Sequence, residues 1–159
     1  MEKLLNILDE ELELYKTILE LSNNKTTLLK ENKVKELEAM TKEEEALVAK
    51  VIEKEKIRIQ EVKNICKAYG KPEQNLKIEE LCEFIDGSQD ELLNYKKEIV
   101  KILEELKNIN KINSSLINSS LEYINFTVNM LTETSKNPVY QAGGFQESRA
   151  QRNLFDVKL

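Results

Sequence analysis

The chain has 159 residues, which favours a single domain, and its four glycines and two prolines leave little punctuation between long helices. Its net charge of −5, with no basic cluster to offset it, argues against a nucleic-acid partner because phosphate binding requires concentrated Lys and Arg. The absence of histidine excludes histidine-based acid–base or nucleophilic catalysis and histidine metal ligation.

Residues 2–30 are predicted to form one helix, because two apolar registers with 3–4 spacing run side by side through them. One register begins at Leu4 and contains Glu11, and the other begins at Leu5. Neighbouring registers lie about 100° apart on a helix, so together they form a broad apolar face. A face of this width indicates contact with two neighbouring helices.

The Glu-Asn-Lys sequence at residues 31–33 interrupts this pattern, and Asn32 is a suitable cap residue. A short helix is predicted to follow over residues 34–40. The interruption could instead be a bend in one continuous helix, and that alternative stays open.

A second long helix is predicted over residues 42–69, because Thr41 and Glu44 match the capping box. Its middle is partly polar, which predicts a narrower apolar stripe than that of the first helix. The predicted inner register is Val48, Ile52, Glu55, Ile59, Val62, Cys66 and Tyr69.

Gly70, with a proline two residues on, is predicted to end the second long helix. A short helix is expected over residues 78–85. Ser88 and Glu91 match a second capping box, so the last helix is predicted to run over residues 89–135.

Charges nearly vanish over residues 112–132 of the last helix, where Glu122 is the only one. An exposed helix face usually carries charge, so this stretch is predicted to pack against another surface of the protein or of a partner. The sequence leaves open whether its apolar face is internal core or a groove for a partner helix. The candidate binding residues are Ile112, Leu116, Ile117, Leu121, Tyr123, Ile124, Val128 and Leu131.

The last helix is expected to stop at Asn137-Pro138. Residues 1–136 are therefore predicted to be one helical bundle domain, and residues 137–159 a flexible tail without helical periodicity. The tail carries apolar residues and a mild positive charge. We therefore expect it to fold back on the last helix when no partner is bound.

Together these segments predict an all-α fold: an elongated antiparallel bundle or coiled coil of three main helices plus one or two short ones. Cys66 and Cys82 are expected to be reduced thiols, with an incidental disulfide as the alternative. No signal peptide is expected, and no stretch approaches the roughly 20 apolar residues of a membrane span. The expected location is the cytoplasm.

The chain has no phosphate-binding glycine loop, and runs of carboxylates such as Glu43–Glu45 fit solvated helix faces or caps. We therefore predict a binding protein, not an enzyme, with no cofactor and no metal. A site built from Glu alone is a remote alternative that metal analysis would test.

Four segments carry a further pattern through their order and spacing, although none is catalytic. They are Glu10, Tyr15, Ile18 and Leu19; then Val34, Leu37, Met40, Thr41, Glu44 and Leu47; then Asn113, Leu116 and Ser120–Tyr123; and finally Tyr140, Gly143–Gly144 and Leu154–Lys158. This pattern, which covers nearly all of the chain, resembles the FlgN family of flagellar export chaperones.

The resemblance implies a cytoplasmic chaperone for hook-associated proteins of the FlgK and FlgL type. Such a chaperone holds a client's C-terminal helical segment before type III export and delivers the client to the export apparatus. In the family, client binding is associated with the C-terminal part, which here corresponds to residues 112–131. The alternative is a structural coiled-coil protein that self-associates into a homo-oligomer and has no client.

Overall fold

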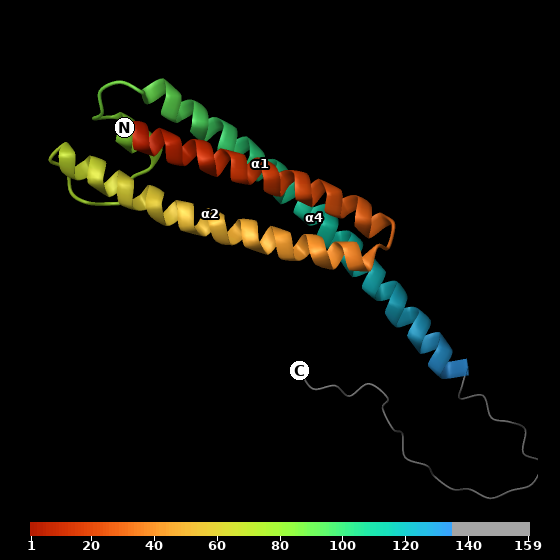
Figure 1. Ribbon diagram of the computed structural model, residues 1–159. Helices are drawn as coiled ribbons and strands as arrows, with labels where there is room; N and C mark the ends of the chain where they lie inside the picture. The colour runs from red at the N-terminus through yellow and green to blue at the C-terminus, as the bar shows by residue number, and fades with distance from the viewer. Residues whose placement is uncertain (135–159) are drawn as a thin grey trace, which may run out of the picture. The chain divides into compact units, whose positions relative to one another are not determined.

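The structure, a computed structural model, describes residues 1–134, with side chains as far as Thr132. Within that range it contains no strand and four helices: α1 (Glu2–Lys30), α2 (Val34–Ala68), α3 (Ile78–Cys82) and α4 (Gln89–Thr134) (Figure 1). The prediction of an all-α fold with three long helices is confirmed.

The chain divides into two compact units, Met1–Leu121 and Glu122–Leu159. The first unit contains α1, α2, α3 and the first part of α4. Of the second unit, the helical residues 122–134 are described. The predicted domain over residues 1–136 stays a prediction, and the predicted tail, with its return onto the last helix, lies outside the described residues.

A tight turn at residues 31–33 joins α1 to α2. Asn32 adopts a left-handed φ of 54°, and its N–H donates to the Leu29 carbonyl at 3.3 Å. The N–H of Lys33 donates to the Leu28 carbonyl at 3.0 Å, which completes a Schellman arrangement. The interruption is therefore a turn between two helices, and the alternative of a bend in one continuous helix is wrong.

The predicted helix start at Thr41 is also wrong. The Thr41 hydroxyl donates to the Leu37 carbonyl at 2.8 Å, which is a bond inside a helix and not an N-terminal cap. Since residues 34–40 contain no Gly or Pro, nothing in them stops the helix, and α2 runs unbroken through the capping-box sequence.

Gly70 ends α2 as predicted, with a left-handed φ of 66°. The following helix is shorter than expected, because α3 stops at Cys82 and the next residues form a turn. The predicted capping box at Ser88 is wrong. Ser88 has a φ of 62°, whereas a capping serine is extended, and its hydroxyl has no hydrogen bond within the described residues.

The three long helices of the first unit run up, down and up. Lys3 pairs with Glu61 at 2.8 Å across the antiparallel α1 and α2. The Tyr95 hydroxyl of α4 donates to Asp9 of α1 at 3.2 Å. In this unit α1 lies between α2 and α4 (Figure 1). The broad apolar face of α1 therefore contacts two neighbours, as predicted.

Two apolar clusters hold this unit together, and α1 contributes to both. The first joins α1, α2, α4 and the segment around α3 through Leu4, Leu8, Val62, Ile65, Cys66, Leu81, Ile85 and Leu92. The second joins α1 and α4 through Leu12, Ile18, Ile102 and Leu106. Cys66 is buried and Cys82 half-buried, and both are free in the structure.

Part of the predicted inner register of α2 is wrong, because Val48 and Ile52 are exposed. Their neighbours Leu47 and Val51 pack against the second cluster instead. The register is buried at Val62 and Cys66, which lie in one cluster with Leu81 of α3. Its last member, Tyr69, is exposed, so that part of the prediction is also wrong. Since α3 has only five residues, it cannot cover the whole register.

Candidate functional site

A polar layer joins α4 to the last two turns of α1. Asn113 is only 3% exposed, and its amide nitrogen donates to the Ser22 carbonyl at 2.8 Å. Its amide oxygen accepts from the Thr26 hydroxyl at 2.6 Å. Since α1 ends at Lys30, one turn after Thr26, residues 117–121 of α4 in the first unit lie at or past the end of α1.

Four of the candidate binding residues lie in the first unit, Ile112 directly before this layer and the other three after it. Leu116 is half-buried, whereas Ile112, Ile117 and Leu121 are exposed, Leu121 to 53% of its surface. An exposed leucine alone is ordinary. Three exposed large apolar residues within ten positions, without a charge between them, form an unusual surface for a helix.

The other four candidate residues lie in the second unit, which is described here by itself. Tyr123, Ile124, Val128 and Leu131 are all exposed, Tyr123 to 71%. Over residues 122–132 of this unit Glu122 is the only charged one. The helical stretch is therefore apolar and nearly uncharged.

Phe126 belongs with these residues and is absent from the predicted set. It is 62% exposed, the same range as its predicted neighbours. It lies outside both apolar registers of the last helix, so a search by periodicity misses it. The signal that could have found it is an aromatic residue within a charge-poor stretch.

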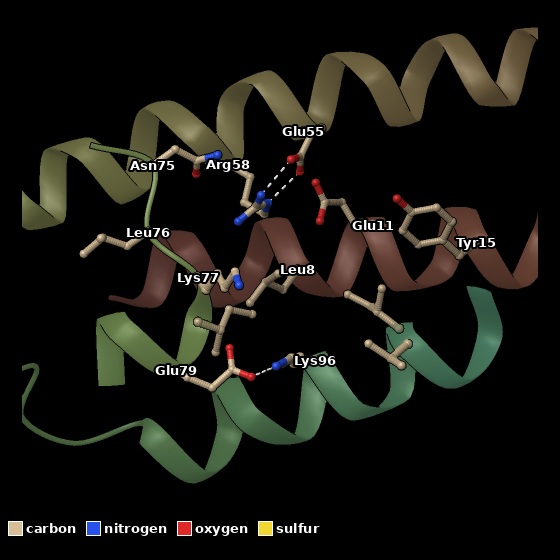
Figure 2. Close-up of a pocket in the computed structure, with 13 residues that line it drawn as sticks. Leu8, Glu11, Tyr15, Glu55, Arg58, Asn75, Leu76, Lys77, Glu79 and Lys96 are labelled. Carbon is tan, nitrogen blue, oxygen red and sulfur yellow. Dashed lines mark hydrogen bonds and ion pairs between the residues drawn. The ribbon is translucent and has the colours of Figure 1, made fainter. Parts of the chain in front are cut away.

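A groove of about 690 Å³ lies in the first unit, and sequence reasoning did not predict it. Figure 2 shows its lining, which comes from all three long helices, from the segment before α3 and from the start of α3. The lining residues are Leu8, Glu11 and Tyr15 of α1, Glu55 and Arg58 of α2, residues 75–79, and Lys96, Ile99 and Val100 of α4.

Glu11 is the unusual member of this lining. It is 3% exposed, and its Oε1 atom has no hydrogen-bond partner. The pKa of this carboxyl is raised from 4.5 to about 7, first by burial and second by the nearby charge of Glu55, whereas Arg58 and Lys54 act in the opposite direction. Glu11 is therefore partly protonated at neutral pH.

The other charges of the groove are mostly paired. The Arg58 guanidinium makes two hydrogen bonds of 2.6 Å to Glu55, and Lys96 pairs with Glu79 (Figure 2). Figure 2 shows the carboxyl of Glu11 lying toward the Glu55–Arg58 pair. The available signal in the sequence was Glu11 itself, a charged residue in an apolar register.

The described residues offer little for metal chemistry or membrane insertion. Within them, no group of three or more His, Cys, Asp or Glu side chains could hold a metal ion. Over the same range, no helix combines the length and the apolar character that a bilayer crossing requires.

The chain matches a known protein family. The family model described as FlgN protein matches residues 1–148, which include all four helices. No curated protein and no solved structure matches the chain. The matched residues include the first three of the four segments on which the family resemblance rests. The chain therefore belongs to the FlgN family, whose members are non-enzymatic cytoplasmic chaperones for the export of flagellar hook-associated proteins.

Proposed function

We propose that this chain binds the C-terminal helical segments of hook-associated proteins of the FlgK and FlgL type before type III export, and then delivers them to the export apparatus. The binding residues are Ile112, Leu116, Ile117, Leu121, Tyr123, Ile124, Val128 and Leu131. An amphipathic client helix would bury its apolar face against them, which is a common mode of peptide recognition.

The observation that supports this proposal best is the exposure of Ile117 and Leu121 directly after the polar layer at Asn113. Up to that layer, one face of α4 packs against α1 through Ile102 and Leu106, whereas Val100 and Leu103 on another face are exposed. Beyond it, α4 keeps its apolar residues while α1 ends. Burial of a leucine or isoleucine contributes about 1.5–3 kcal/mol, so a helix that covers this surface would be held firmly.

The test is the affinity of the purified chain for a full-length hook-associated protein, measured by isothermal titration calorimetry. Leu121→Asp should weaken binding at least about tenfold, because it places a charge in the apolar contact. Asn118→Asp is the matched control. It adds the same charge at another exposed position of α4, one turn earlier, and should leave the affinity nearly unchanged.

Thermal unfolding of both variants separates lost binding from lost structure, since both substituted residues are exposed. Failure of the unaltered chain to bind either client type would contradict the proposal. A fixed oligomer in light scattering that ignores both clients would instead support the self-associating coiled coil.

A further inference from the structure

The groove lies where a fourth helix would complete the bundle of the first unit. At one end this position is filled by the segment around α3, whose Leu81 and Ile85 are buried with Val62, Cys66 and Leu92. Further along, the space between α2 and α4 is open, and Leu8, Glu11 and Tyr15 of α1 lie among its lining.

The two walls continue as exposed apolar residues beyond the groove's own lining. On α2, Ile52 lies one turn from Glu55, and Val48 lies one turn further. On α4, Leu103 lies one turn from Ile99 and Val100. Val48, Ile52, Val100 and Leu103 are all exposed. Apolar residues one turn apart on two walls fit the ridges of an inserted helix.

The charges of the groove define the chemistry of its occupant. Arg58 is neutralised by Glu55, and Lys96 by Glu79. Lys77 also lines the groove, and it is exposed. Glu11 is the buried charged group, and its Oε1 atom has no hydrogen-bond partner. A buried carboxylate without a partner is unfavourable, and a cation that hydrogen-bonds to it removes that penalty. The complementary group is a lysine or arginine side chain.

We propose that the groove binds an amphipathic helix of the client whose Lys or Arg side chain pairs with Glu11. This inference rests on the proposed function and adds a second docking site to it. Val100 and Leu103 share one register of α4 with Ile117 and Leu121, with exposed polar residues in between. Within the first unit, one face of α4 therefore connects the groove to Ile117 and Leu121 of the proposed client surface.

The first experiment locates the client by photo-crosslinking on the full chain. The photoreactive residue p-benzoylphenylalanine replaces Val100 in the groove, Leu121 on the proposed surface, or Asn108, an exposed position on another side of α4. In complex with a full-length FlgK- or FlgL-type protein, positions 100 and 121 should form adducts, and position 108 should not. Mass spectrometry of the position-100 adduct should identify a client segment with a Lys or Arg within one helical turn.

The second experiment removes the charge of Glu11 with little change of shape. At pH 8, Glu11→Gln should weaken client binding by about tenfold to a hundredfold, the range expected for a lost charged hydrogen bond. Glu13→Gln is the matched control, because Glu13 lies on α1 two residues on and is exposed. Its affinity should equal that of the unaltered chain.

The outcomes separate the two proposals. An adduct at position 121 without one at position 100 overturns the groove inference and leaves the proposed function in place. A position-100 adduct on a segment without a basic residue also overturns it, as does unchanged affinity of Glu11→Gln. Loss of all binding by the unaltered chain overturns the proposed function, and the groove inference with it.

Discussion

Glu11 lies in an apolar register of α1, at a position where the packing pattern predicts an apolar side chain. It follows Leu8 by three residues and precedes Tyr15 by four, so the three share one face. The sequence alone shows that a charged residue, Glu11, stands in an apolar register. It does not show that Glu55 and Arg58 lie beside Glu11, because this depends on which residues of the antiparallel α2 lie opposite α1.

The raised pKa of Glu11 links the stability of the fold to pH. Its folded-state pKa of about 7 exceeds the ordinary value of 4.5, so the folded chain binds more protons between these two pH values. The free energy of unfolding should therefore fall as pH rises through this window, by about 3 kcal/mol. Above about pH 7 the free energy of unfolding has lost the whole of this contribution, and below about pH 4.5 it has lost none of it.

Glu11→Gln should abolish this loss. We expect the variant to be more stable than the unaltered chain at pH 8 and about equally stable at pH 4.5, because the amide is neutral at both values. Urea unfolding at the two pH values measures the difference, with the exposed Glu13→Gln as control. Equal stability of Glu11→Gln and the unaltered chain at pH 8 would show that the charge of the buried carboxylate does not lower the free energy of unfolding.

At the scale of elements, the end of α2 at Gly70 and the start of α4 at Gln89 were predicted correctly, whereas the start of the second long helix at residue 42 was not. Gly70 ends α2 because its left-handed backbone is nearly unique to glycine. Thr41 and Ser88 matched the capping pattern, yet neither caps a helix. A hydroxyl caps only where the backbone before it leaves the helix, and the pattern alone does not contain that information.

Thr41→Ala distinguishes the observed α2 from the predicted pair of helices. A capping threonine contributes about 1 kcal/mol, so its removal would destabilise the fold. In the observed helix Thr41 is internal, and alanine has the higher helix propensity. We therefore expect unchanged or slightly higher stability, by up to about 0.5 kcal/mol, in urea unfolding. A loss near 1 kcal/mol would restore the break at residue 41.

The candidate surface and the groove differ in how far the sequence predicts them. The charge-poor stretch after Lys111 is local in the sequence, and all but one of the eight predicted residues are exposed. The groove depends on the length of α3, which ends three residues earlier than expected. A periodic pattern identifies an apolar register such as Val48–Cys66, but not how much of it a neighbour covers.

At the scale of the first unit, the layer at Asn113 ties all three long helices together. Asn113 joins α4 to Ser22 and Thr26 of α1, and the Ser22 hydroxyl donates to Glu44 of α2 at 3.2 Å. A buried amide with both ends satisfied fixes one alignment of the helices, because a shift by one turn would leave it unpaired.

Asn113→Ala should therefore destabilise the first unit by about 1–3 kcal/mol, the range expected when hydrogen-bonded buried groups lose their partner. The control Asn110→Ala, at an exposed position one turn earlier, should change the free energy of unfolding by less than about 0.5 kcal/mol. Urea unfolding measures both. Equal effects of the two substitutions would show that the layer contributes nothing beyond helix formation.

The lack of histidine gives Glu11 a further significance. Among the side chains that the structure describes, Glu11 is the one with a pKa of about 7, so no imidazole obscures its titration. A cation beside it would favour the carboxylate, and occupancy of the groove would release a proton at neutral pH. The carboxyl carbon resonance of an isotopically labelled Glu11 would thus be a native reporter of the groove's occupancy.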